Sequence, residues 1–300
     1  MSVLVIGTIA LDSIKTPYSE NPRLLGGSAS HAAVAASFFS SVSLVGVVGS
    51  DFPENYLELY NKHSIDIRGL ERKEGQTFFW AGEYEVNMNN RQTLETILGV
   101  IENWLPDIPD ELKEKPYVLL ANCEPKLQRH ILQQVSNSKS LVVADTMDLW
   151  LNIARDELLA LLKEIDCLVL NDSEARQLTK ENNAVVAAKH IHELGPKYVI
   201  VKKGEHGAIL SAPKGLFIAP AFPLSKLTDP TGAGDSFVGG LIGYLAAAGG
   251  DIEDHFRKAV IHGSVTASFC CEGFGLSATT DTTREAIDAR VAKLETLVKF

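Results

Sequence analysis

The sequence lacks the features that define several large classes of protein. It has only four cysteines in 300 residues, too few and too poorly spaced for a disulfide framework or a C-x-x-C metal site, so buried free thiols are expected. No run approaches eighteen uninterrupted apolar residues, so no membrane span is expected. Basic residues are the minority, 28 against 38 acidic ones, and the net charge of −10 argues against a nucleic-acid-binding surface. The N-terminal run "MSVLVIGTIALDS" has no basic segment before it, which predicts a first strand, not a signal peptide, and a cytoplasmic protein.

Short apolar runs that alternate with segments of helical periodicity predict the fold class. The runs are rich in Val, Ile and Leu without an alternating polar face, which is typical of buried parallel strands. Strand–helix alternation of this kind predicts an α/β fold, a three-layer doubly wound and mostly parallel sheet. The expected strands span 2–7, 43–49, 117–122, 140–145, 167–172 and 198–204, and the expected helices span 28–39, 54–63, 125–135, 156–163, 173–179 and 185–194.

Two segments have a different pattern. Residues 8–18 and 76–92 alternate β-forming residues with polar ones, which predicts strands with one dry and one wet face. We expect these segments to form a small antiparallel β lid on the main sheet. No linker or repeat divides the chain, so residues 1–300 are expected to form a single domain that carries this lid.

The stretch "TDPTGAGDSFVGG", residues 228–240, carries the strongest chemical signal. Its glycines allow a ligand to approach the main chain at the start of an apolar helix, where free N–H groups and the helix dipole attract an anion. Asp235 would stand beside that anion and accept a proton. As a bare glycine-rich turn the stretch is more typical of a helix cap with close packing, but the whole string is far more specific than a bare turn. The sequence contains neither a P-loop motif nor G-x-G-x-x-G after a strand, and Gly239 lies one place too late for a nucleophile elbow.

Three weaker motifs accompany it, and each has a structural alternative. Gly26–Gly27 precede an Ala-rich helix and allow close approach by a hydroxylated molecule, or simply a tight turn. Asn171 and Glu174 follow a strand and would hold hydrated magnesium, or form a helix capping box. Lys202 or Lys203, in "VIVKKGEHG", would meet a nucleotide phosphate, or would be solvated lysines.

Taken together, these motifs resemble the ribokinase-like, or PfkB, family of carbohydrate and nucleoside kinases over nearly the whole chain. "DPTGAGDSFVGG" is similar to that family's C-terminal signature, "GGSASHAAVAA" to its N-terminal glycine pair, "NDSEA" to its N-x-x-E element and "KKGEHG" to its nucleotide loop. The resemblance implies transfer of phosphate from ATP to a hydroxyl of a small sugar, with Mg²⁺ as cofactor. A nucleoside acceptor is the nearest alternative, and a non-catalytic ligand sensor is an alternative of another class.

The resemblance also implies roles for individual residues. Asp235 would be the catalytic base, with Gly232, Ala233 and Gly234 forming the anion hole. The other implied sites are the nucleotide (Asn171, Lys202, Gly204, Gly207 and Gly234), Mg²⁺ mostly through water (Glu174), a loop for K⁺ (Asp229, Thr231 and Ser277), and the acceptor (Asp12, Gly26, Gly27 and His31). His31 has a packed core histidine as its alternative. Trp80, Tyr84, Asn87 and Asn89 would face the acceptor from the lid or pack within it, and a homodimer through the lid is implied by resemblance alone.

The sequence also departs from ribokinases proper at the acceptor end. Ala10 stands where they usually carry Asn, and Ser28 and His31 stand at positions usually held by Lys and Asn. Because paired polar groups decide which hydroxyl pattern a pocket accepts, these changes make free ribose a doubtful acceptor. They leave the phosphate machinery untouched.

Overall fold

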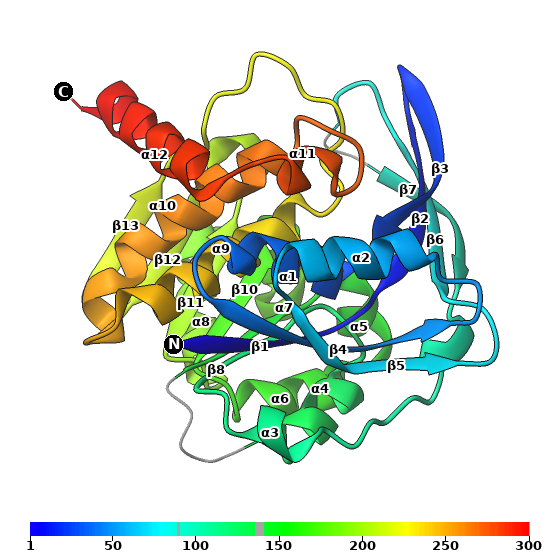
Figure 1. Cartoon of the computed structure of the whole chain (residues 1–300). Coiled ribbons are helices and arrows are strands. Elements are labelled where there is room, and N and C mark those ends of the chain that lie inside the picture. The colour runs from blue at the N-terminus through cyan, green and yellow to red at the C-terminus, as the bar shows by residue number, and fades with distance from the viewer. Residues whose placement is uncertain (89–90, 136–140, 300) are drawn as a thin grey trace.

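A nine-stranded sheet forms the centre of the computed structural model, which describes residues 1–88, 91–135 and 141–299 (Figure 1). Its strands lie in the order β13-β12-β11-β10-β9-β8-β1-β4-β5; the pairs from β11 to β5 are parallel and the last two, β11–β12 and β12–β13, are antiparallel. The mostly parallel, doubly wound sheet expected from the sequence is therefore confirmed. The strands are β1 (Ser2–Ile6), β4 (Ser41–Gly49), β5 (Asp66–Lys73), β8 (Tyr117–Leu120), β9 (Leu141–Asp145), β10 (Cys167–Asn171), β11 (Tyr198–Lys202), β12 (Ala208–Ala212) and β13 (Gly215–Ala219).

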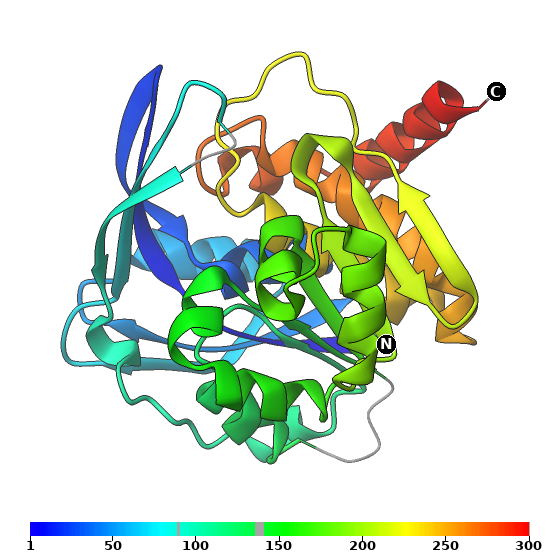
Figure 2. The same cartoon turned by 180° about the vertical axis from the view of Figure 1, so that it is seen from behind.

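Helices cover both faces of this sheet, as Figure 1 and the reverse view in Figure 2 show. They are α1 (Ser28–Ser37), α2 (Glu54–Lys62), α3 (Asp110–Lys113), α4 (Pro125–Leu132), α5 (Asp148–Ile153), α6 (Arg155–Leu162), α7 (Asp172–Thr179), α8 (Ala184–Glu193), α9 (Ala233–Ala248), α10 (Ile252–Cys270), α11 (Ser277–Thr280) and α12 (Arg284–Val298), with short 3₁₀ helices η1 (Gly99–Ile101) and η2 (Gly204–His206). None of the described helices combines the length and apolar character that a bilayer crossing requires.

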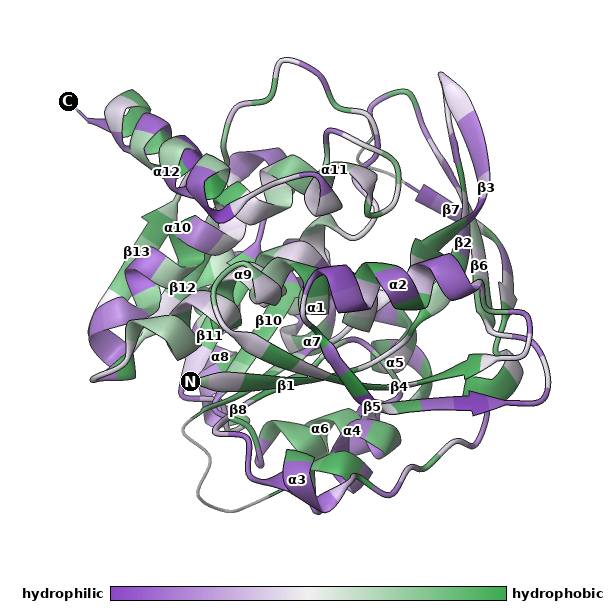
Figure 3. Cartoon of the chain, in the orientation of Figure 1, coloured by the Kyte–Doolittle hydropathy of each residue, from purple (hydrophilic) through white to green (hydrophobic). Residues whose placement is uncertain are grey.

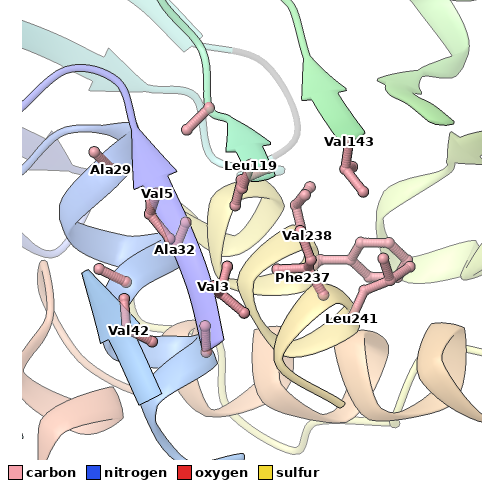
Figure 4. Close-up of a cluster of buried hydrophobic side chains, with 14 of the residues drawn as sticks. Val3, Val5, Ala29, Ala32, Val42, Leu119, Val143, Phe237, Val238 and Leu241 are labelled. Atoms are coloured by element: carbon pink, nitrogen blue, oxygen red, sulfur yellow. The ribbon is translucent and has the colours of Figure 1, made fainter. Parts of the chain in front are cut away.

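Alternate residues of the strands belong to two separate cores. In β1, Val3 and Val5 pack with α1, α9 and α10, whereas Leu4 and Ile6 pack with α4, α6, α7 and α8. Figure 4 shows part of the first core, in which Val3 and Val5 of β1 lie between α1, with Ala32, and α9, with Val238. Because both faces of the strands are dry, the apolar runs lack the alternation of a half-exposed sheet, and Figure 3 shows these strands in green.

Helix α9 is held close to α1 by small residues. A Cβ on Gly239 would lie 2.2 Å from the Ala32 carbonyl oxygen, and one on Gly243 would lie 2.8 Å from Ala36 Cα. Two glycines four residues apart fall on one side of a helix, so the Ala-rich face of α1 fits against that side. This contact fixes the start of α9 relative to the sheet.

A second, four-stranded sheet, called here the lid sheet, stands at one end of the central sheet (Figure 1). Its order is β3-β2-β6-β7, with β2 (Ala10–Thr16), β3 (Ser19–Gly26), β6 (Phe78–Tyr84) and β7 (Arg91–Ile97). The pairs β2–β3 and β6–β7 are antiparallel as expected, while the central pair β2–β6 is parallel. The expected segments 8–18 and 76–92 thus supply two strands, and their partners β3 and β7 extend the sheet beyond them. Asn89, a candidate residue of the lid, lies outside the described residues.

Candidate active site

The carboxyl ends of three neighbouring strands bring charged side chains to one edge of the central sheet. Val169 of β10 pairs with Asp145 of β9, and Asn171 of β10 pairs with Lys202 of β11. The Lys202 ammonium donates to both oxygens of Asp145, over 3.2 and 3.3 Å from Nζ. Ligands bind outside this edge in doubly wound sheets, so the position is that of a binding site.

Helix α9 begins at this edge with a partly buried stretch of main chain, residues 232–234, called here the cradle. Gly232 is the N-cap and has φ 77°, a left-handed conformation that favours glycine. A Cβ on Gly234 would lie 3.0 Å from Lys202 Nζ, so the ammonium is held against the first turn of the helix. First-turn N–H groups have no partner within a helix and carry the positive end of its dipole. The cradle and Lys202 together form a site for an anion.

Asp235 follows the cradle in the first turn of α9 and is only partly buried. Burial raises its pKa above the ordinary value, and the positive charges of Lys202 and Arg91 counteract that rise. A carboxylate whose proton affinity is raised beside an anion site is suited to general base catalysis.

Asp12, on β2 of the lid sheet, is 5% exposed and lies near Asp235. Burial raises its pKa to about 7; the Gly27 N–H, which donates to its carboxylate, opposes the rise, and the negative charges of Asp235 and Asp229 add to it. A Cβ on Gly26 would fall 1.9 Å from Asp12 Oδ2, so the glycine pair makes room for this carboxylate. Asp12, Gly26 and Gly27 are therefore together, as the sequence predicted.

Asn171 and Glu174 form the capping box that was the structural alternative for this motif. The Asn171 N–H donates to Glu174 Oε2 over 2.7 Å, and the Glu174 N–H donates to Asn171 Oδ1 over 2.8 Å. Glu174 is 6% exposed, and burial raises its pKa to about 7, with Lys202 opposing and Asp145 adding to the rise. One carboxylate oxygen thus caps helix α7 while the group remains electrostatically coupled to the site.

Three carboxylates, Asp145, Glu174 and Asp235, act on the Lys202 ammonium at this edge, and Arg91 is a second cation that acts on Asp235. Burial alone would lower the Lys202 pKa, but Asp145, Glu174 and Asp235 together hold it above the ordinary value. The surplus of carboxylate oxygens over cations suits a hydrated Mg²⁺, which prefers oxygen ligands and keeps several waters. The described residues contain no cluster of three or more His, Cys, Asp or Glu side chains placed to ligate a metal directly.

The loop after β11 carries the two candidate nucleotide glycines, and the structure separates them. Nothing lies within 4 Å of a Cβ placed on Gly204, whose surroundings are open. A Cβ on Gly207 would lie 2.0 Å from the Ala219 carbonyl oxygen, so this glycine packs the loop onto β13. The loop is closed by the Lys203 N–H, which donates to the Gly207 carbonyl over 2.7 Å. Gly204 follows Lys202 by two residues and faces open space, whereas Gly207 has a packing role.

The candidate K⁺ loop is only partly assembled. The fully buried Asp229 accepts hydrogen bonds from the N–H groups of Thr231 (2.9 Å) and Gly275 (3.2 Å). The Ser277 hydroxyl, expected to join them, instead donates to the Phe274 carbonyl over 2.8 Å. Asp229 and Thr231 therefore lie together, while the Ser277 hydroxyl points to a different partner.

His31 is the candidate whose position differs most from the expectation. It is 1% exposed and lies beneath the cradle: a Cβ on Gly232 would fall 2.2 Å from its ring. Burial lowers its pKa to about 4, so the ring is neutral near pH 7, and Nδ1 lies 3.8 Å from Cys270 Sγ. Among the described residues its Nε2 has no hydrogen-bond partner. This position fits the packed-histidine alternative, because the ring supports the cradle from inside the core.

The structure adds two residues that the sequence reasoning did not include. Asp145 is 5% exposed beside Lys202, and burial raises its pKa to about 6, with Lys202 opposing and Asp235 adding to the rise. Its signal in the sequence was an acid at the end of the apolar run "SLVVAD". Arg91, on β7, is the second residue, and its positive charge acts on the carboxylates of Asp12 and Asp235. Nothing in the sequence marked Arg91 as a site residue except its place in a predicted lid segment.

Comparison with known proteins gives one family for the whole chain. Residues 3–283 match the model of the pfkB family carbohydrate kinases. A cytidine kinase of Thermococcus kodakarensis is 27% identical over 252 residues, which cover 81% of this chain and 88% of that protein.

Solved structures show the same fold. The nucleoside kinase of Methanocaldococcus jannaschii superposes with a TM-score of 0.77 at 22% identity, covering 97% of this chain and 98% of that one. A protein of Escherichia coli described as a ribokinase II, in complex with ATP and Mg²⁺, superposes with a TM-score of 0.79 at 18% identity, covering 97% of this chain and 99% of that one.

Proposed function

The chain belongs to the pfkB family of carbohydrate kinases, which are ATP-dependent phosphotransferases, and on this premise we propose that it phosphorylates a hydroxyl of a small sugar at the sheet edge around Asp235. The observation that carries the proposal is the partly buried Asp235 beside the cradle, with Lys202 held against Gly234. The first turn of α9 thus carries the proposed base and the anion site, and the Lys202 ammonium contacts it from β11. Phosphoryl transfer depends on such positioning and charge stabilisation.

Each group has a proposed task. Asp235 takes the proton of the acceptor hydroxyl, whose oxygen then attacks the γ-phosphorus in line. The N–H groups of Gly232 and Gly234 stabilise the charge of the transferring group as an anion hole. Ala233, whose N–H donates to the Pro230 carbonyl over 3.1 Å, keeps the main chain of the cradle in place between them. Lys202 and Gly204 lie on the nucleotide side, and Asp12 with Gly26 and Gly27 binds the acceptor hydroxyls.

Mg²⁺ fits the residues on the nucleotide side. We propose that Glu174 and Asp145 hold it through its waters, because their carboxylates outnumber the nearby cations. When bound, the ion neutralises charge on the phosphates. For K⁺ we propose the loop of Asp229 and Thr231. Equal turnover in potassium and tetramethylammonium salts would contradict the proposed K⁺ site.

An acceptor screen tests the proposed function. We expect ADP release to depend on one member of a panel containing ribose, fructose, adenosine, cytidine and inositol, with Mg²⁺ present. Because ribose contacts are altered at Ala10, Ser28 and His31, we expect ribose itself to be a poor acceptor. The similarity to a cytidine kinase over most of its length favours a nucleoside as the second candidate. No acceptor-dependent ADP release across a broad panel would instead support a ligand sensor.

We also propose a homodimer through the lid sheet. Tyr18, in the turn before β3, and Leu94, on β7, are 77% and 54% exposed and would supply apolar contacts to a second copy. Burial of these side chains in a second copy would remove them from water. Sedimentation equilibrium is expected to give twice the chain mass of 32.6 kDa, and Leu94→Glu to halve it. A monomeric wild-type protein would remove the proposal.

A further inference from the structure

One face of the lid sheet looks toward the site. Asp12 on β2 is in register with Trp80 on β6, and Tyr84 on β6 is in register with Arg91 on β7. Residues paired across strands lie on the same face, and residues two apart along β6 share it, so these side chains belong to one surface. The Thr231 hydroxyl next to the cradle donates to the Tyr84 hydroxyl over 3.0 Å, which joins this surface to the site.

Arg91 is held on that surface by an aromatic ring. Its guanidinium carbon lies 5.3 Å from the centroid of Trp80. The Trp80 ring is fixed in turn, because Nε1 donates to Thr93 Oγ1 over 3.2 Å and the six-membered ring lies along Gly82, where a Cβ would be only 2.1 Å away. Within the described ranges no salt bridge joins Arg91 to a carboxylate. A stacked guanidinium keeps its N–H donors for another partner.

The charge of Arg91 is directed at the reacting end of the site. It lowers the pKa of both Asp12 and Asp235, so it acts on the proposed acceptor ligand and on the proposed base together. Lys202 approaches Asp235 from the opposite side, from the central sheet. The other charged groups that act on Asp12 and Asp235 or lie beside them are Asp145 and Asp229. Two cations, Lys202 and Arg91, therefore act on the Asp235 carboxylate, beside which the γ-phosphorus would be transferred.

We propose that Arg91 is a catalytic residue that binds the phosphoryl group during its transfer, a step that rests on the proposed function. The acceptor hydroxyl gives its proton to the Asp235 carboxylate while its oxygen forms a bond to the γ-phosphorus. The bond from that phosphorus to the β–γ bridging oxygen breaks, and ADP leaves with the electron pair. The planar guanidinium donates two parallel N–H bonds to oxygens of the transferring group from the lid side.

The N–H donors of Arg91 could also bind a carboxylate or phosphate carried by the acceptor. The negative charges at the acceptor end of the site argue against an anionic acceptor. Asp12 is buried at the acceptor end, and the neighbouring Asp229 is fully buried as well. An acceptor carboxylate or phosphate at this end of the site would be repelled by the negative charges of Asp12 and Asp229, with little water to screen them. The transferring phosphoryl group passes beside Asp235, where Lys202, Arg91 and the cradle offset its charge.

Arg91→Gln and Arg91→Lys test the assignment, with Lys15→Gln as the matched control. Lys15 is a lid-sheet cation on β2 that pairs with Glu83 in solvent, so its removal changes the lid charge equally. In Arg91→Gln we expect kcat to fall roughly 10²–10³-fold with both KM values within about threefold, the size seen when one donor to a developing anion is removed. Arg91→Lys should regain little, because an ammonium lacks the bidentate fork. Lys15→Gln should behave as wild type.

A binding measurement without acceptor separates this inference from the proposed function. Calorimetry with ADP, Mg²⁺ and aluminium fluoride, which mimics the transferring group, should show at least a tenfold loss of affinity in Arg91→Gln, with ADP and Mg²⁺ alone unchanged. Equal affinity of wild type and variant for the mimic would overturn the role of Arg91, whether or not an acceptor has been found. An increase confined to the KM of an anionic acceptor would also overturn it, by placing the guanidinium on the acceptor.

Discussion

Replacing Asp235 by Asn is expected to lower kcat by roughly 10²–10⁴-fold, the contribution usual for a positioned general base. The amide keeps the shape of the carboxyl group and cannot take the hydroxyl proton. The fold should be kept or slightly strengthened, because burial raises the Asp235 pKa and a neutral group avoids the cost of a charged one there. Steady-state kinetics with the acceptor found in the screen, calorimetry with ADP and Mg²⁺, and thermal unfolding measure the three effects. We expect nucleotide affinity within about threefold of wild type.

Asp254→Asn is the control for this change. Asp254 also lies in the first turn of a helix, α10, but its side chain is exposed and pairs with Lys214 on the surface. The variant loses a helix-terminal charge of the same kind without touching the site, and its turnover should equal that of wild type. Full activity in Asp235→Asn would show that another group accepts the proton. A comparable loss in both variants would mean that net charge, not the base, sets the rate.

The central fold was predictable because its cause is local. The inner strands are apolar on both faces, and the helices between them bury apolar side chains against the sheet. The pattern of apolar residues therefore predicts the alternation of strands and helices. Strand β5 (Asp66–Lys73) was missed because its sequence "DIRGLERK" is polar and it lies at the sheet edge, with only β4 beside it. The partners in the lid sheet were missed for a similar reason: most of β3 and β7 is exposed, so neither shows a continuous dry face.

The site was predictable only where one short segment contains all of it. Gly232–Asp235 fold as a unit, so their sequence specifies the cradle and places the proposed base beside it. Asp145 acquires its role only when strand order sets β9 beside β10, and Arg91 only through a lid-sheet register that includes a bulge at Ala81 and Gly82. The sequence left two roles open for His31, an acceptor contact and a packed core histidine, because its position depends on the packing of α1 against α9, which no motif encodes.

Replacing Lys202 by Met is the second change with a large expected effect. The ammonium donates to Asp145 and lies within a group that includes Glu174 and Asp235, so its removal leaves buried carboxylates without their cation. Loss of one partner of a buried ion pair costs about 3–5 kcal/mol of stability. Activity should fall as well, because the cradle loses the cation beside Gly234. Urea unfolding and steady-state kinetics measure both effects.

The pH dependence of these losses distinguishes a charge effect from a packing defect. Asp145 and Glu174 already have pKa values raised to about 6 and about 7, and without Lys202 both rise further. A carboxyl group whose pKa is raised in the folded state binds its proton more tightly there, so stability is present at low pH and lost as pH rises through the folded pKa. The stability deficit of Lys202→Met should therefore be large at pH 8 and small at pH 5. The Asp235 pKa also rises, which moves the acidic limb of kcat to higher pH. Lys203→Met, the same change one residue along, should show neither effect, and a deficit independent of pH in Lys202→Met would refute the electrostatic role.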